Sequence, residues 1–194
     1  MSNRSPLSPQ LLVYAYSNGY FPMPDHGTGQ IGWFRPDPRA IIPINDFHTS
    51  RSLRRTMSRI PFHVTFDQNF AEIMKACANR EGTWINAEFI GAYCELHRRG
   101  YAHSIEVWLE NELVGGLYGV SLSGGFFAES MYHKATDASK VALFHLIKHM
   151  QKQSMALLEV QFLTPHLKTL GAIEISDEKY ILMLQDAMAS SARF

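Results

Sequence analysis

The chain has 194 residues, of which 46% are hydrophobic, and its formal net charge is zero. This length suits one compact domain with a smaller appended unit. No run of about 20 apolar residues occurs, and the first ten residues lack the apolar centre of a signal peptide, so we expect neither a transmembrane helix nor a secretion signal.

The charges are divided unevenly along the chain. Residues 1–60 contain seven arginines, no lysine and three acids, whereas the remaining residues contain 11 bases and 15 acids. This division indicates an anionic partner for the first part, although a solvated arginine-bearing surface explains it equally well. Cys77 and Cys94 have no metal-ligand spacing, so we expect plain buried thiols in a reducing cytoplasm.

Residues 1–60 predict a small arginine-bearing lobe. Ser8 is typical of a helix start and Gly19 of a helix end. Prolines and aromatic residues between residues 20 and 39 indicate an ordered surface without regular structure. Residues 40–44 predict a short strand.

A second helix of this lobe is predicted over 48–59. Three of its arginines have the spacing of one helix face: Arg51, Arg54 and Arg55. Because like charges repel one another, such a face suits an anion such as phosphate.

Residues 61–194 predict a larger unit. The expected order is a strand (62–66), two helices (67–79 and 86–99), a three-stranded meander (104–132), a helix (139–152), a strand (156–163), a short helix (165–170), a strand (173–175) and a last helix (177–188).

The meander has two unusual features. Gly115 and Gly116 lie inside its middle strand, where glycine marks a bulge or the close approach of another segment. Glu129 lies among apolar residues of its third strand, and a buried carboxylate costs free energy unless it has a partner. We therefore expect something to lie along the meander.

The order of elements resembles the Gcn5-related N-acetyltransferase (GNAT) fold, an α/β (α+β) acyltransferase fold. GNAT enzymes carry a glycine-rich pyrophosphate loop before the helix that follows the meander. Residues 133–139 of this chain contain no glycine at that position. Because those glycines let backbone N–H groups approach phosphate, we do not expect acetyl-CoA to bind in the usual way.

Several short motifs, in chain order, resemble the leucyl/phenylalanyl-tRNA–protein transferase family from about residue 11 to 185. They are Gly19-Tyr-Phe-Pro22, Trp33-Phe-Arg-Pro-Asp-Pro-Arg39, Phe47-His-Thr-Ser-Arg-Ser-Leu-Arg54, Gly82-Thr-Trp-Ile85, Ala102-His-Ser-Ile-Glu-Val-Trp108, Leu113-Val-Gly-Gly-Leu-Tyr-Gly-Val120, Glu129-Ser-Met-Tyr132, Gln161-Phe-Leu-Thr-Pro-His-Leu167 and Leu170-Gly-Ala172.

The resemblance implies an aminoacyltransferase. Such an enzyme moves leucine or phenylalanine, with methionine as a further candidate, from aminoacyl-tRNA to the N-terminal arginine or lysine of an acceptor protein, which marks that protein for N-degron proteolysis. Because the tRNA ester is already activated, no cofactor, ATP or metal is expected. A GNAT-fold acyltransferase with another acyl donor and a non-catalytic module that binds tRNA or N-termini remain as alternatives.

The resemblance also implies the acceptor side of the site. Glu159 and Gln161 match the acid and the glutamine that orient and deprotonate the incoming amine, although the family usually has Asp at the first position. A surface acid on an edge strand is the alternative for Glu159. Glu129 matches the acid that meets the basic acceptor residue, and an ion pair with Lys140 is its alternative.

On the donor side, Leu117 and Phe126 match the apolar amino-acid pocket, with core packing as the alternative. Trp84 matches the tryptophan that stacks on the terminal adenosine, and Met23 stands where some members have a second tryptophan. Contacts to the tRNA backbone are expected from four arginines: Arg39, Arg51, Arg54 and Arg55.

Overall fold

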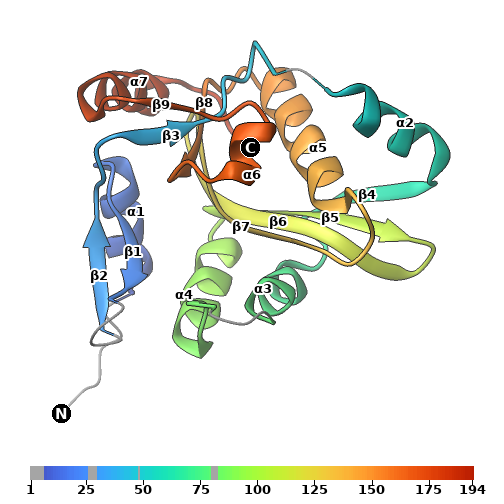
Figure 1. Cartoon of the computed structure of the whole chain (residues 1–194). Helices are drawn as coiled ribbons and strands as arrows, with labels where there is room; N and C mark the ends of the chain where they lie inside the picture. Colours follow the sequence, from blue (N-terminus) through green and yellow to red (C-terminus); the bar gives the residue numbers. More distant parts are fainter. Residues whose placement is uncertain (1–6, 26–29, 48, 80–82) are drawn as a thin grey trace.

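A computed structural model of the chain describes residues 7–25, 30–47, 49–79 and 83–194. Its centre is a seven-stranded sheet with the strand order β4-β5-β6-β7-β8-β3-β9, and β1 and β2 form a separate two-stranded sheet (Figure 1). The elements are α1 (Pro9–Ser17), β1 (Phe21–Pro24), β2 (Ile31–Phe34), β3 (Arg39–Ile41), α2 (Arg51–Arg59), β4 (Phe62–Phe66), α3 (Phe70–Ala78), α4 (Ala87–Arg98), β5 (Ala102–Leu109), β6 (Glu112–Leu122), β7 (Gly125–His133), α5 (Ala138–Lys152), β8 (Leu157–Gln161), α6 (Pro165–Thr169), β9 (Ile173–Ile175) and α7 (Asp177–Ala189).

The GNAT-like order of elements predicted for the second unit is confirmed, and β5, β6 and β7 form the antiparallel meander. Ser8 and Asn86 cap α1 and α4 through their side chains, as their positions in the sequence indicate. Asp67 is not the cap of α3. It has φ 60° and accepts hydrogen bonds from the β5 backbone and from His103 instead.

Two parts of the first lobe differ from the prediction. Residues 20–39, expected to be irregular, contain the antiparallel pair β1 and β2. The strand β3 lies inside the main sheet, between β8 and β9, so this one segment of the predicted lobe shares the sheet with the rest of the chain. His48 and Gly82, which belong to a predicted helix and a family motif, lie outside the described residues.

The sheet has helices on both faces, which explains why its central strands are apolar on both sides. The buried core between the sheet and α1, α3, α4 and α7 occupies one face, and α5 with α2 covers the other (Figure 1). The glycine pair of β6 lies between these layers. A Cβ on Gly115 would stand 2.5 Å from the Cβ of Ala138 on α5, and a Cβ on Gly116 would collide with Ile73 on α3. The segments that approach the meander here are therefore two helices of the same chain.

The strands β7 and β8 run side by side for only a short distance. Their parallel pairing covers three residues of each strand, 125–127 and 157–159, and the two strands then separate. On its other edge, β7 has a bulge: Tyr118 of β6 pairs with Ser130 and Gly119 with Ala128, so Glu129 is the extra residue. A bulge redirects a side chain and increases local twist, and here it accompanies the opening between β7 and β8.

Within the described residues, no helix is long and apolar enough to cross a membrane. Cys77 and Cys94 are not joined in a disulfide within the described residues; Cys77 is buried, as expected, and Cys94 is half-buried.

Candidate active site

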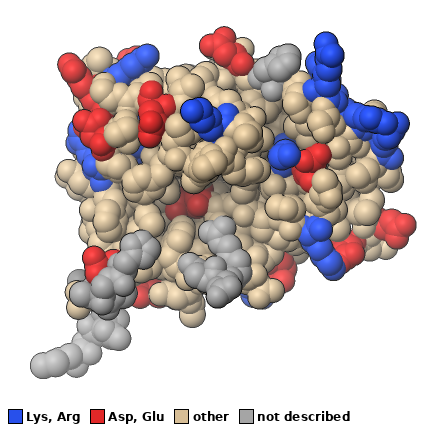
Figure 2. All heavy atoms as spheres, in the orientation of Figure 1, with Lys and Arg blue, Asp and Glu red and all other residues tan. Residues whose placement is uncertain are grey.

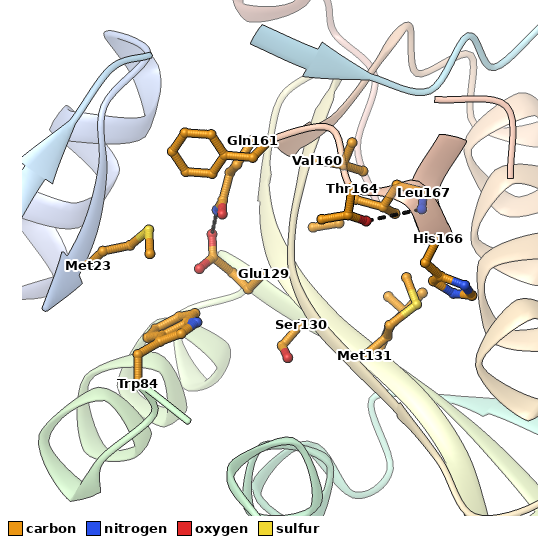
Figure 3. Close-up of a pocket in the computed structure, with 13 residues that line it drawn as sticks. Met23, Trp84, Glu129, Ser130, Met131, Val160, Gln161, Thr164, His166 and Leu167 are labelled. Carbon is orange, nitrogen blue, oxygen red and sulfur yellow. Dashed lines mark hydrogen bonds between the residues drawn. The ribbon is translucent and has the colours of Figure 1, made fainter. Parts of the chain in front are cut away.

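A cavity of about 290 Å³ lies where β7 and β8 separate. Figure 3 shows its lining residues arranged around this opening, with β7 and β8 side chains converging from its two sides. Thirteen of the described residues line it: Met23, Trp84, Leu117, Ala128, Glu129, Ser130, Met131, Val160, Gln161, Phe162, Thr164, His166 and Leu167. The opening therefore collects side chains from the β1–β2 hairpin, the α3–α4 connection, the meander, β8 and the segment after β8.

One end of the cavity is polar and is organised around Glu129, which is only 9% exposed. Tyr16 donates a hydrogen bond to Glu129 Oε1 over 2.6 Å, and Gln161 Nε2 donates to the same oxygen over 2.9 Å. The hydroxyl of Tyr93 lies 2.5 Å from that of Tyr16 and 3.4 Å from Glu129 Oε2. Lys140, the expected alternative partner, pairs with Asp137 instead.

These surroundings favour the protonated form of the Glu129 carboxyl group. Burial raises the pKa of Glu129 to about 8; the hydrogen bond from Tyr16 opposes this shift, and the charge of Glu159 reinforces it. Burial, followed by the negative charge of Glu129, also raises the pKa of Tyr16 and of Tyr93, so both phenols remain protonated donors. A carboxyl group that changes charge near neutral pH is typical of functional sites.

The other end of the cavity is apolar. Leu117, Ala128 and Met131 come from the meander, and Val160 and Leu167 come from β8 and α6. These residues belong to the core under α5 or pack against it. Phe126, which was expected to line the pocket, does not. It is fully buried, and its ring lies over Gly119 and beside Phe194.

Trp84 and Met23 lie at the polar side of the cavity and come from distant parts of the chain (Figure 3). The Trp84 ring stands edge-on against Phe89 with 5.0 Å between centroids, which holds one side of the indole against α4. The sequence prediction paired these two residues, and the structure brings them to one cavity.

Glu159 and Arg39 are not where the sequence prediction put them. Glu159 is 1% exposed and does not line the cavity, whereas Gln161 does. Arg39 is 0% exposed, and its Nη1 lies 2.8 Å from Glu159 Oε1. The prediction that Arg39 contacts tRNA phosphate is therefore wrong, because β3 is an internal strand and carries this arginine into the core.

The three arginines of α2 are exposed, as predicted: Arg51, Arg54 and Arg55. Figure 2 shows Lys and Arg side chains gathered over α2 at the right edge of this face of the molecule. Leu53 is the buried residue that fastens the helix to the core, so the arginines point away from it.

In GNAT enzymes a phosphate-binding loop precedes the helix that corresponds to α5. In this chain Asp137 stands at the N-terminal end of α5. Asp137 accepts hydrogen bonds from Lys140 and from Thr56 of α2. A phosphate at this helix end would meet a carboxylate, which agrees with the absence of the glycine loop from the sequence.

The sequence analysis assigned no role in this site to Tyr16, Tyr93, Met131 or His166, although Met131 and His166 lie inside motifs that resemble the family. Tyr16 and Tyr93 occupy buried positions of α1 and α4. A tyrosine at a buried helical position needs a partner for its hydroxyl group, and this requirement was the signal available in the sequence.

Comparisons with known proteins identify relatives over most of the chain. Residues 41–185 match the family model "Leucyl/phenylalanyl-tRNA protein transferase", and residues 5–37 match that of its N-terminal domain. A protein of this name from Herpetosiphon aurantiacus is 52% identical over 189 residues, covering 97% of this chain and 98% of the relative. One from Salinibacter ruber is 49% identical and covers 87% of this chain and 75% of the relative.

Solved structures with a similar arrangement share little sequence. L-PGS from Bacillus licheniformis has a TM-score of 0.42 and 11% identity, with 82% of this chain and 55% of that chain covered. A ribosomal-protein-alanine N-acetyltransferase from Brucella melitensis has a TM-score of 0.37 and 14% identity, with coverages of 48% and 74%.

Proposed function

The chain belongs to the leucyl/phenylalanyl-tRNA–protein transferase family, and we propose that the cavity between β7 and β8 is where it joins leucine or phenylalanine to an N-terminal arginine or lysine. The enzyme transfers an aminoacyl group from tRNA to the N-terminus of a protein. The observation that carries the proposal is the polarity of this cavity, which has hydrocarbon walls at one end and the carboxyl group of Glu129 at the other.

The apolar end receives the side chain of the transferred amino acid. Leu117, Met131 and Val160 offer only hydrocarbon and a thioether, so leucine and phenylalanine lose no hydrogen bond on entering. Methionine fits the same walls and is a further donor. A polar side chain would leave its hydrogen-bonding groups unpaired there, which excludes it.

The tRNA is held at two places. Trp84 stacks on the terminal adenosine with Met23 opposite, a contact worth about 1–3 kcal/mol per base. The exposed arginines of α2 neutralise phosphates of the acceptor stem, which contributes affinity without reading sequence.

The polar end receives the acceptor. The guanidinium or ammonium group of its first residue pairs with Glu129, which has no cationic partner among the described residues. Gln161 keeps its Nε2 on Glu129 and offers its Oε1 to the α-amine. The α-ammonium loses one proton to water, the amine nitrogen forms a bond to the ester carbonyl carbon, and the ester C–O bond breaks. The remaining extra proton passes to the departing ribose oxygen, so the enzyme contributes mainly proximity and orientation.

The product is a protein that begins with leucine or phenylalanine. We place this reaction in the cytoplasm, where charged tRNA is available, and assign the product to N-degron proteolysis.

A transfer assay tests the proposal. Phe-tRNA and a peptide that begins with arginine are incubated with the protein, and mass spectrometry measures the gain of one phenylalanine residue. A peptide that begins with citrulline, the uncharged analogue of arginine, is the matched control and is expected to remain unmodified. No transfer to the arginine peptide at micromolar protein would refute the proposed function.

A further inference from the structure

Phe162 is an exposed aromatic residue inside the cavity. Its side chain lines the cavity and is 44% exposed, so a large part of its ring is open to a ligand. Of the described residues that line the cavity, Phe162 contributes the phenyl ring and Trp84 the indole ring. Aromatic side chains that remain uncovered in a pocket are typical of ligand contacts.

Phe162 lies on the side of the cavity where Met23 and Trp84 lie. Figure 3 shows these two residues on one side and Leu167 on the other. The Phe162 ring stands edge-on against Phe21 of β1, with 5.7 Å between centroids. Phe21 and Met23 are two residues apart on β1, which pairs with β2 without a register shift, so their side chains leave the strand on the same face. Phe162 therefore lies beside Met23.

The ring of Phe162 is held by the rest of the chain. Phe21, against which it packs, is buried and stacks on Phe34 with 6.4 Å between centroids. The guanidinium carbon of the buried Arg39 lies 5.3 Å from the centroid of Phe21. The backbone N–H of Phe162 donates to the carbonyl of Val160 over 2.8 Å. Because the ring is already ordered, it loses little conformational entropy when a ligand binds.

A flat apolar ring at this place suits a nucleobase. Every base has a π face, so stacking on an aromatic side chain holds a base without hydrogen bonds. The transferred amino-acid side chain has its walls at the apolar end of the cavity, whereas Phe162 lies with Trp84 and Met23. Met23 packs on a base through a flexible thioether chain. The phenyl ring beside it supplies the π surface that Met23 lacks.

We propose that Phe162 is a second aromatic contact for the terminal adenine of the tRNA, which lies between Trp84 on one side and Phe162 with Met23 on the other. The inference rests on the proposed function, because that function brings the adenosine to this side of the cavity. It assigns Phe162 to donor binding and gives it no contact with the reacting groups.

Filter binding of two RNA hairpins to the full chain tests the inference. Both end like tRNA in two cytidines and an adenosine, and both carry phenylalanine through an amide bond that resists transfer. The second hairpin has a hydrogen in place of the terminal adenine. Phe162→Leu removes the ring and keeps hydrocarbon against Phe21. It is expected to weaken binding of the complete hairpin about 10-fold and binding of the abasic hairpin by less than about twofold.

Three other variants control for fold and for ring chemistry. Phe162→Tyr retains the ring and is expected to bind the complete hairpin within about threefold of the wild-type protein. Tyr101→Leu removes a ring that is 40% exposed and does not line the cavity, and it is expected to leave binding of both hairpins unchanged. Phe162→Met, with a longer flexible side chain, repeats the comparison if Phe162→Leu does not fold.

Three results would overturn the inference. An equal loss for both hairpins would mean that the ring contacts the amino acid or only shapes the cavity. Unchanged binding of the complete hairpin by Phe162→Leu would mean that the ring contacts nothing in the donor. A change confined to the KM for the arginine peptide would assign Phe162 to the acceptor.

The failure of this inference is distinguishable from the failure of the proposed function. If the wild-type protein transfers phenylalanine to the arginine peptide and one of these three results is found, only the adenine contact of Phe162 fails. If the wild-type protein transfers nothing, the proposed function fails, and the comparison of the two hairpins still decides whether Phe162 contacts the base.

Discussion

Replacing Glu129 by glutamine should change how the stability of the protein depends on pH. The pKa of Glu129 is about 8 in the folded protein, against an ordinary value of 4.5, because burial disfavours the ionised form. Between these two values the folded protein holds a proton that the unfolded chain has released. The free energy of unfolding therefore falls as pH rises through this window, since the folded state must either retain the proton or bury a charge.

The size of the effect follows from the two pKa values. Each pH unit inside the window costs about 1.4 kcal/mol, so wild-type protein should lose about 3–4 kcal/mol relative to Glu129→Gln between about pH 5 and about pH 8. Glutamine has nearly the same shape and no charge at either pH. Tyr16, Tyr93 and Glu159, which face Glu129, are present in both proteins, so their own titration largely cancels in the difference.

Urea unfolding of both proteins across this pH range measures the difference. Glu112→Gln removes an exposed carboxylate at the start of β6 and serves as the control, with an expected change within about 0.5 kcal/mol at every pH. If wild-type protein and Glu129→Gln lose stability in parallel as pH rises, the raised pKa of Glu129 is refuted.

Three further changes test other parts of the structure. Trp84→Ala should weaken Phe-tRNA binding in a filter assay by about 1–3 kcal/mol, whereas Trp84→Phe should retain most of the affinity. Equal affinities of the wild-type protein and Trp84→Ala would exclude stacking on the indole. Replacing Arg51, Arg54 and Arg55 by alanine should lower the slope of log K against log salt by about one for each phosphate that is no longer neutralised, and an unchanged slope contradicts their role. Gly119→Ala places a Cβ against the Phe127 carbonyl oxygen and the Phe126 ring, so urea unfolding should show a loss of about 1–3 kcal/mol. Gly91→Ala on α4 is its control, because that Cβ meets nothing within 4 Å and alanine favours the helix.

Much of the fold was available from local sequence signals. Caps such as Ser8 and Asn86, helical spacing of apolar residues and the two turns of the meander predicted the helices and the order of elements. The hairpin β1–β2 was missed because prolines and aromatic residues over 20–39 gave no alternation from which to infer strands.

The candidate site was predicted in part. Met23, Trp84, Leu117, Glu129 and Gln161 come together at one cavity, as their family motifs implied. The interpretation of Arg39 as a surface contact failed because residue type and local spacing do not report whether a strand is internal. The sequence could not decide whether Phe126 lines the pocket or packs in the core, since both environments select apolar side chains.

By itself the sequence determined the elements of the second unit, their order and the chemical types present at the site, because these depend on neighbours within a few residues. Only the tertiary structure decided which residues face the cavity and which support it. The placement of β3 between β8 and β9 buried Arg39 against Glu159, and the separation of β7 from β8 opened the cavity. Both depend on pairing between segments more than 100 residues apart or on where a pairing stops, and no local pattern encodes either.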